Sequence, residues 1–320
     1  MTLITTSPTR TAGTRPNRVR SRPTRPAWEE KPGLLGRIGK MLSLAVILLL
    51  ILFPLYCVVI TSFSTQGSIN VAGGIVVVPH GLTLGAYHEM LSGGVVTRAM
   101  VIALAITFAG TAISMAVSVM CAYGLSRQRS YGHRLILMTF IVTMFFGGGL
   151  IPTFIVVADV FQGYDQYWAL ILPSAVSVFN ILIIRAFYLN TARDLIDAAR
   201  IDGAGDWRIL WSVVLPTSKA VSAVMALFYG VGYWNSWFNV MLYMPADSGK
   251  WPIQYVLYEY VNQGATMPGA AAQQVAGHAQ SAPLSLQMAV VVLTLVPIVI
   301  VYPFVQKHFA KGALTGAIKG

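Results

Sequence analysis

The sequence contains one long polar stretch between hydrophobic segments, DAARIDGAGDWRILWSVVLP (Asp197–Pro216). Residue spacing predicts a helix over Thr191–Asp202, on which Asp197 and Arg200 can pair at i, i+3. Gly203 suits the left-handed C′ position that ends a helix. The stretch is therefore expected to be ordered, although most of the chain around it is apolar.

A second short helix is predicted over Trp207–Val214, with Asp206 as its N-cap. Pro216 suits the first turn of the next apolar helix, because its φ is fixed and it has no N–H. Two short helices at a fixed angle, with alanines at Ala198 and Ala199 that admit another backbone, would fit a socket on a partner. The alternative is an amphipathic interfacial helix between two membrane spans, and these features alone leave both interpretations open.

The composition indicates a polytopic membrane protein. Of 320 residues, 56% are hydrophobic and 10% are charged, against about 25% charged in soluble domains. Mean hydropathy is +0.66. Cys57 and Cys121 lie inside apolar runs, so neither a disulfide framework nor a metal site is expected.

The apolar pattern predicts an all-α fold with six transmembrane helices. Residues 1–40 are predicted to be a disordered basic cytoplasmic tail, 41–308 the membrane domain with its coupling loop at 191–217, and 309–320 a cytoplasmic tail. A short helix is expected in the first loop, over LGAYHEML (Leu84–Leu91). The spans are expected at about 41–63, 97–124, 135–158, 168–189, 219–243 and 284–305.

The charge distribution predicts the orientation. The net charge is +11, and every Lys and Arg except Arg98 and Lys250 falls in the two tails or near the loops after spans two and four. Because cytoplasmic loops are enriched in Lys and Arg, both termini and the polar stretch are expected in the cytoplasm. This asymmetry explains the charge without nucleic acid, and a solvated tail is favoured over one that binds nucleic acid or anionic lipid.

The order of residues in the polar stretch resembles the EAA loop of permease subunits of binding-protein-dependent ABC importers. That pattern is Glu-Ala-Ala, three residues, Gly, nine residues and Ile-x-Leu-Pro. Here Asp197-Ala198-Ala199 is followed by Gly203 and then by VVLP (Val213–Pro216) at the same spacing. The sequence departs from the pattern at Asp for Glu and at Val for Ile.

The resemblance extends over residues 41–320. YPFVQK (Tyr302–Lys307) and GAIKG (Gly316–Gly320) are similar to the maltose-type carbohydrate permeases. FFGGGLIPTF (Phe145–Phe154) and YWNSWFNVMLYM (Tyr233–Met244) are similar to the branch for complex oligosaccharides and aldouronates. The resemblance implies a type I ABC importer permease fold in the cytoplasmic (inner) membrane of a bacterium.

It also implies partners and roles. The EAA helix would fit a groove of a cytoplasmic ATPase, where Asp197 meets a basic residue, Ala198 and Ala199 pack, and Gly203 makes the turn. Leu215 and Pro216 complete the motif. The expected partners are a second permease subunit in a heterodimer, two ATPase subunits, an extracytoplasmic solute-binding protein, membrane lipid and a sugar.

No catalytic residue, metal site or cofactor is predicted on this chain. The sequence lacks a P-loop, and its five histidines are isolated. ATP and Mg are expected on the partner ATPase, which the tail ending at Gly320 would approach by the same resemblance.

Polar residues at membrane depth are the candidate substrate path, because they are costly in lipid and tend to face a cavity. The candidates are Asn180, Trp234, Asn235 and Asn239, since aromatic faces and amides suit sugars. The alternatives are an interfacial aromatic belt and amides that lock helix to helix. Gly147–Gly149, beside Pro152, is compatible with a hinge or with a site of tight helix packing, and tight packing is favoured.

Three functions are compatible with these patterns. The first is a carbohydrate ABC permease, expected to carry an oligosaccharide. The second keeps the mechanism with a peptide or another small solute as cargo. The third is a channel or scaffold whose polar stretch is merely interfacial. ATPase co-purification separates the first two from the third, and the cargo separates the first from the second.

Overall fold

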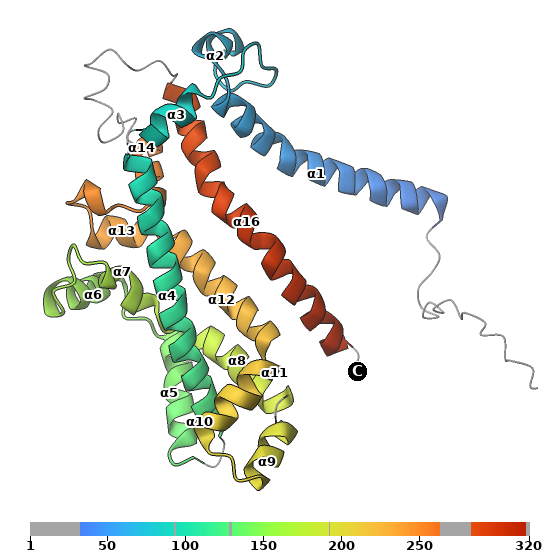
Figure 1. Ribbon diagram of the computed structural model, residues 1–320, viewed down its shortest axis with the longest axis vertical. Helices are drawn as coiled ribbons and strands as arrows, with labels where there is room; N and C mark the ends of the chain where they lie inside the picture. Colours follow the sequence, from blue (N-terminus) through green and yellow to red (C-terminus); the bar gives the residue numbers. More distant parts are fainter. Residues whose placement is uncertain (1–32, 93, 128–129, 192, 263–282, 318–320) are drawn as a thin grey trace, which may run out of the picture. The chain divides into compact units, whose positions relative to one another are not determined.

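The computed structural model describes residues 33–92, 94–127, 130–191, 193–262 and 283–317 (Figure 1). The chain divides into two compact units, residues 1–53 and 54–320, and each is described by itself. The predicted disorder of residues 1–32 and the Ala/Gln-rich centre of the loop after span five both lie outside the described residues.

The first unit contains most of helix α1 (Leu34–Ser62). The helix begins at Leu34 and not at Met41, so the disorder predicted for residues 1–40 is wrong over 34–40. The first helical bond runs from the Arg37 N–H to the Gly33 carbonyl at 3.0 Å, and no proline follows until Pro54. The units divide at Pro54, where the missing N–H removes one helix hydrogen bond.

The second unit is helical, and one isolated bridge between Ser64 and Leu82 is its only strand-like pairing among the described residues. The all-α prediction is confirmed for that part of the chain. Its elements are α2 (Gln66–Ala72), α3 (Gly85–Ser92), α4 (Val95–Ser126), α5 (His133–Phe145), α6 (Leu150–Ile155), η1 (Val156–Val160), α7 (Trp168–Ile171), η2 (Leu172–Ser174), α8 (Val178–Thr191), α9 (Arg193–Ile201), α10 (Asp206–Ile209), η3 (Leu210–Val214), α11 (Leu215–Thr217), α12 (Lys219–Trp234), α13 (Trp237–Tyr243), η4 (Ser248–Lys250), α14 (Ile253–Asn262) and α16 (Pro283–Ala317).

Three described helices are long and apolar enough to cross a membrane, at Leu34–Ser62, Val95–Ser126 and Leu284–Phe304. Three further candidates are pairs of helices that bend at a short break, by 114°, 50° and 84°. By length and composition the described residues therefore hold three spans, or up to six if each bent pair is one span.

Span three is broken and not continuous as expected. The axis turns by 114° between α5 and Leu150–Val160, across Gly147–Gly149. Gly149 has φ +84°, which favours glycine, and a Cβ built on Gly147 would meet nothing within 4 Å. The prediction of tight packing at these glycines is therefore wrong, because they form the break itself.

Spans four and five are also broken. Pro173 lies in η2, and the axis bends by 50° before α8. Span five stops at Trp234 and resumes at Trp237 as α13. At this break two side chains donate hydrogen bonds to backbone carbonyls. The Asn235 amide donates to Val231 O at 3.0 Å, and Ser236 Oγ donates to Tyr233 O at 3.0 Å.

Other boundaries also differ from the prediction. The helix α3 confirms the one expected in the first loop, whereas α2 and α14 are additional helices. α16 passes through Pro297 and Pro303 and runs to Ala317. The expected tail 309–320 is therefore helical up to residue 317.

α4 is the helix on which the second unit is assembled, and it packs against both α12 and α8. Its buried stripe contains small residues, Ala103, Gly110, Ser114, Ser118 and Ala122. A Cβ on Gly110 would lie 2.7 Å from the ring of Tyr233 on α12. Small residues thus let α12 approach α4 closely, as in many membrane helix pairs.

Candidate functional site

The polar stretch lies in Arg193–Thr217, which comprises α9, α10, η3 and α11 and which we name the coupling segment after the role expected for it. α9 ends as predicted, with Gly203 at φ +78°. The Gly203 N–H donates to Arg200 O and the Ala204 N–H donates to Ala199 O, both at 3.0 Å. This pair of bonds is a Schellman end, which turns the chain sharply back.

The two faces of α9 differ. Ile196 is buried and Ala199 is partly buried, both in a core cluster of the second unit. Ala198 is exposed, and Leu195 and Ile201 are 49% and 88% exposed. Ala198 and Ala199 therefore do not share one exposed face as expected, because Ala199 packs against the core cluster under α9.

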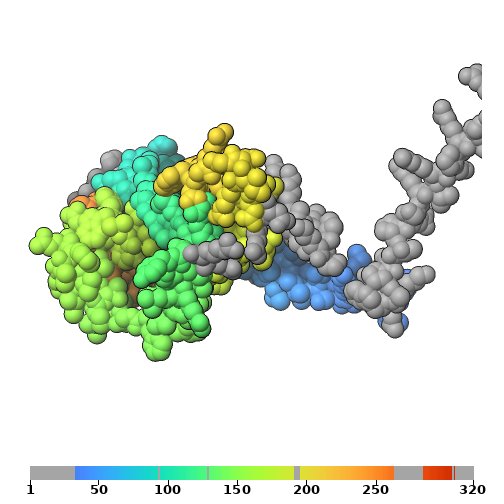
Figure 2. Space-filling view, turned by 90° about the horizontal axis from the view of Figure 1, so that it is seen from below, coloured from blue at the N-terminus to red at the C-terminus, as the bar shows by residue number. Residues whose placement is uncertain are grey.

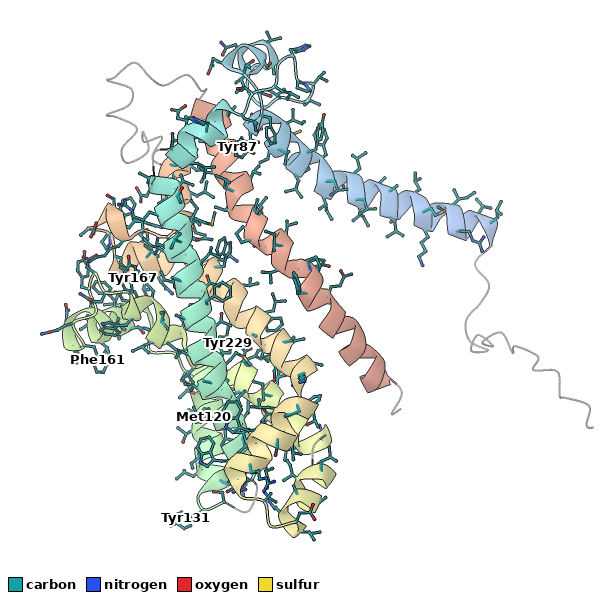
Figure 3. All side chains as sticks on the ribbon, viewed as in Figure 1. Tyr87, Met120, Tyr131, Phe161, Tyr167 and Tyr229 are labelled. Atoms are coloured by element: carbon teal, nitrogen blue, oxygen red, sulfur yellow. The ribbon has the colours of Figure 1, made fainter. Side chains whose placement is uncertain are left out.

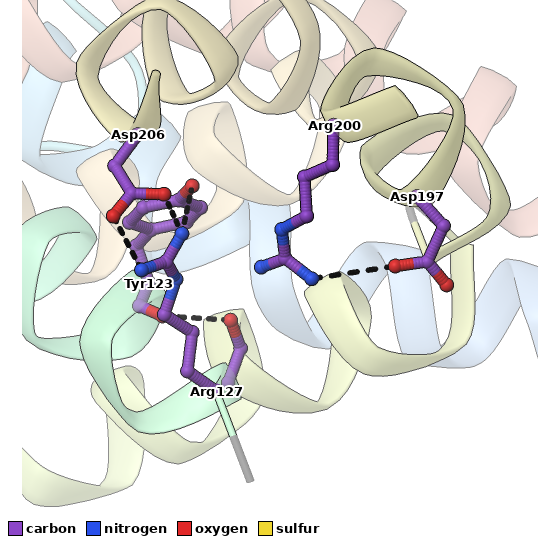
Figure 4. Close-up of polar contacts among 6 residues, drawn as sticks. Tyr123, Arg127, Asp197, Arg200 and Asp206 are labelled. Carbon is purple, nitrogen blue, oxygen red and sulfur yellow. Dashed lines mark hydrogen bonds and ion pairs between the residues drawn. The ribbon is translucent and has the colours of Figure 1, made fainter. Parts of the chain in front are cut away.

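Two acidic residues of the segment form ion pairs (Figure 4). Arg200 Nη1 lies 3.3 Å from Asp197 Oδ1, which confirms the predicted i, i+3 pair. Asp206 pairs with Arg127, the residue that follows α4. The Arg127 guanidinium also lies over the Tyr123 ring, 5.3 Å from its centroid.

The prediction that Asp206 is an N-cap is wrong. Gly205 is the cap, with φ −71° and ψ 163°, and Asp206 is the first residue of α10. Its carboxylate is turned to Arg127 instead, and an acid in a first helical turn also suits the helix dipole.

The second half of the segment is bound to the membrane helices by apolar packing. Ile209, Leu210 and Val214 are buried in the cluster that also holds Ile181 and Ile184 of α8. Leu215 is partly buried and Pro216 is exposed. Pro216 lies in α11 and not in the first turn of α12, because an 84° bend at Ser218 separates the two helices.

The structure has a cavity of about 600 Å³ where the breaks of spans four and five meet. Asn180 and Asn239 both contribute to it, whereas Trp234 and Asn235 do not. Trp234 is buried in another core cluster, and the Asn235 amide is held by Val231 O. The lining residues are Ser174, Ser177, Asn180, Leu227, Phe228, Tyr229, Val231, Gly232, Tyr233, Ser236 and Asn239.

Asn180 is the buried amide of this cavity. The residue is 5% exposed, and its backbone N–H donates to Ser177 Oγ at 3.4 Å. An amide that lines a cavity can both donate and accept hydrogen bonds, so this group is suited to a polar cargo or to water.

Two tyrosines of α12 form hydrogen bonds with the backbone at the break of span four. Tyr233 OH donates to Ile171 O at 3.0 Å, and Ser177 N–H donates to Tyr229 OH at 3.1 Å. These backbone groups lie on either side of the break between η2 and α8. Tyr229 lies between α12 and α4 in Figure 3.

The same hydroxyls contact α4. Ser114 Oγ lies 2.8 Å from Tyr233 OH and Ser118 Oγ lies 2.6 Å from Tyr229 OH. Sequence reasoning missed these pairs. The available signal was a four-residue spacing of two serines on one span and of two tyrosines on another.

A separate charged cluster lies in the loops on the side predicted to be extracytoplasmic. Lys250 Nζ lies 2.7 Å from Asp165 Oδ2 and 3.8 Å from Asp247 Oδ2. The hydrogen bond to Asp165 raises the pKa of Lys250, so the lysine is charged at neutral pH. Asp165 has φ +60°, and its N–H donates to Tyr243 O at 2.7 Å. The cluster joins the loop before α7 to the loop after α13.

Comparisons with known proteins agree with this architecture. Residues 81–314 match the family described as the binding-protein-dependent transport system inner membrane component. The chain belongs to this family. It is therefore a multi-pass inner-membrane component of a transport system, and such systems also include a partner permease, an ATPase and a solute-binding protein.

Individual relatives match over most of their length. The polygalacturonan/rhamnogalacturonan transport system permease protein YtcP of Bacillus subtilis (strain 168) is 39% identical, over 88% of this chain and 96% of the relative. Protein LplC of the same organism is 36% identical, over 91% and 97%. A chain from the crystal structure of a bacterial ABC transporter involved in the import of the acidic polysaccharide alginate matches with a TM-score of 0.79 and 26% identity, over 88% of this chain and 100% of that chain.

Proposed function

We propose that this chain is the permease subunit of an ABC importer that moves a carbohydrate, an oligosaccharide by expectation, across the cytoplasmic membrane. The observation that carries the proposal is the coupling segment: a short exposed helix, ended at Gly203, whose inner face packs on the membrane helices. An exposed helix with a buried base can pass a force from a partner to the membrane domain.

In this proposal α9 docks on a cytoplasmic ATPase. Leu195, Ala198 and Ile201 are the exposed positions that would enter the partner's groove. Asp197 would meet a basic residue, and Gly203 would set the turn. Ile196 and Ala199 would transmit the movement inward through their cluster, while Leu215 and Pro216 connect the segment to span five. ATP and Mg belong to the ATPase.

The cargo is proposed to be a carbohydrate because two kinds of observation agree. The names of the relatives refer to polygalacturonan, rhamnogalacturonan and alginate. The cavity combines amides, hydroxyls and aromatic rings, which bind sugar hydroxyls and stack on their C–H faces. Asn180 and Asn239 are the proposed cargo contacts.

The proposed assembly contains this chain, a second permease as heterodimer partner, two ATPase subunits and an extracytoplasmic binding protein, within membrane lipid. The bent pairs His133–Val160 and Trp168–Asn190 are each taken as one span, and α12 with α13 as the fifth, which gives six spans and cytoplasmic termini. The cytoplasmic C-terminal region follows residue 308, and the membrane domain begins near Leu34.

Ala198→Trp tests the docking role. The bulky ring should prevent α9 from entering a groove, so ATPase co-purification and sugar uptake should both be lost. Val71→Trp is the matched control, since Val71 is 77% exposed on α2. This helix belongs to the loop after span one, on the side predicted to be extracytoplasmic. If Ala198→Trp retains both the ATPase and uptake, α9 is not the coupling helix.

Asn180→Ala tests the cargo path. Uptake of the sugar bound by the cognate binding protein should fall, while ATPase co-purification stays normal. Asn262→Ala, at the exposed end of α14, is the control. Unchanged uptake in Asn180→Ala would remove this residue from the path.

A further inference from the structure

The second half of the coupling segment, Asp206–Thr217, has two faces. Its inner face is buried, whereas Trp207 and Trp211, four residues apart, are 66% and 67% exposed. By contrast, the exposed large apolar residues of α9, Leu195 and Ile201, are aliphatic and not aromatic. The surface of the coupling segment is seen in yellow in Figure 2.

Both ends of Asp206–Thr217 are fixed at the ends of candidate membrane spans. Asp206 is paired with Arg127, which directly follows the last helical residue of α4, Ser126. At the other end the chain enters α12 at Lys219. The segment makes an angle of 84° with α12, so it runs across the span and not along it. A helix that joins two span ends in this direction lies in the plane of the membrane–water interface.

Its side chains suit that position. Tryptophans are enriched at the interface, where an apolar ring and a polar N–H are both accommodated. Arg208 and Lys219 are exposed, and neither forms an ion pair with an acid whose side chain the structure describes. Such cations are attracted to the anionic lipids of the cytoplasmic leaflet by about 1 kcal/mol each.

We propose that Asp206–Thr217 is an interfacial helix whose Trp207 and Trp211 lie in the head-group layer of an anionic membrane surface, with Arg208 and Lys219 on lipid phosphates. Only the choice of the cytoplasmic leaflet rests on the proposed function. α9 then projects past this layer into water, and in Figure 1 it lies beyond α10 and α11 at the lower end of the second unit. The two halves of the segment thus contact different partners, lipid for one and protein for the other.

The test places a nitroxide label on the full-length chain in nanodiscs of phosphatidylcholine and phosphatidylglycerol. Single cysteines replace Trp207, Trp211 or Ile201 in a Cys57→Ala, Cys121→Ala background. Labels at 207 and 211 should be more accessible to oxygen than to a water-soluble nickel complex, and the label at 201 should show the reverse. Water-like accessibility at 207 and 211 would overturn the proposal.

A second measurement keeps the native cysteines. Brominated phosphatidylglycerol should quench a component of the tryptophan fluorescence that Trp207→Phe, Trp211→Phe removes. Replacing Arg208 by Gln should lower the preference of this component for phosphatidylglycerol over phosphatidylcholine by up to about fivefold. Equal quenching in the wild type and the double variant contradicts the proposal.

Addition of the cognate ATPase separates this inference from the proposed function. Protection of the label at 201 alone supports both. If 201 is not protected while 207 and 211 remain in lipid, the docking role of α9 fails and the interfacial helix stands. If 207 and 211 are in water until the ATPase protects them, their partner is a protein and the lipid assignment is wrong.

Discussion

The turn that ends α9 takes its shape from its own backbone, whereas the cavity takes its shape from side chains of distant elements. At the segment, Gly203 and the two hydrogen bonds around it turn the chain within a few residues. At the cavity, the hydroxyls of Tyr229 and Tyr233 on α12 form hydrogen bonds with backbone groups at the break of span four. One site is built locally and the other by tertiary contacts.

This difference suits two mechanical requirements. A docking helix must keep its shape while it moves as a body, and backbone hydrogen bonds provide that without outside help. A cavity between helices must close its unsatisfied backbone groups in an apolar environment, because no bulk water is available there. Tyrosine hydroxyls that bridge two helices meet this need.

The largest expected effect is at Gly203. Gly203→Val places a β-branched residue at φ +78°, which should destabilise the native turn by about 2 kcal/mol or more. A loss of about thirtyfold in the population of the native turn follows. Uptake and ATPase co-purification should both fall.

Gly205→Val is the control for this change, because Gly205 has φ −71° and open space for a Cβ. The same loss in both variants would mean that the segment does not depend on its left-handed turn.

The second-largest effect is expected in the packing between α4 and α12. Gly110→Ala would place a Cβ 2.7 Å from the Tyr233 ring, so α12 must move away from α4. We expect a loss of about 1–3 kcal/mol in stability, measured as a lower Tm of the purified chain. Gly124→Ala on the same helix meets nothing within 4 Å, and because alanine is the better helix former it should not lower the Tm.

A smaller effect is expected from the hydroxyl contacts themselves. Tyr233→Phe leaves Ser114 and the Ile171 carbonyl without their partner, at about 0.6–1.5 kcal/mol for a hydrogen bond between membrane helices. A double-mutant cycle with Ser114→Ala, followed by unfolding, should give a coupling energy of this size. Additive single effects would show that the contact contributes nothing to the joint between α4 and α12.

The smallest effect is expected at Arg127 and Asp206. Their side chains are 31% and 52% exposed, so the pair should contribute about 0.5 kcal/mol to stability. Asp206→Asn should therefore leave the Tm nearly unchanged while making the second half of the segment more mobile in spin-label spectra. Asp197→Asn, which breaks only a pair within α9, should not increase that mobility.

The local site was largely predictable from the sequence. The turn at Gly203 and the pair between Asp197 and Arg200 depend on residues a few positions apart. The role of Asp206 was not predictable, since its partner Arg127 is 79 residues away. A side chain that could cap a helix goes to an ion pair when tertiary structure supplies one.

The breaks in spans three, four and five were also not predictable from the sequence. Apolar composition predicts that a segment enters the membrane, and it is the same on both sides of a break. The sequence predicts that Asn235 faces the substrate, but in the structure its amide donates to Val231 O. Asn180 and Asn239 do reach one cavity, because the breaks of two spans meet there.

For the proposed cargo path, the tyrosine contacts also define where selectivity can change during evolution or by design. The hydroxyls of Tyr229 and Tyr233 are engaged with α4 and with the broken helix, so altering them disturbs the scaffold. Asn180 and Asn239 line the same space from positions outside these contacts. A library confined to these two residues can therefore vary the chemistry of the cavity wall while the architecture around it is retained.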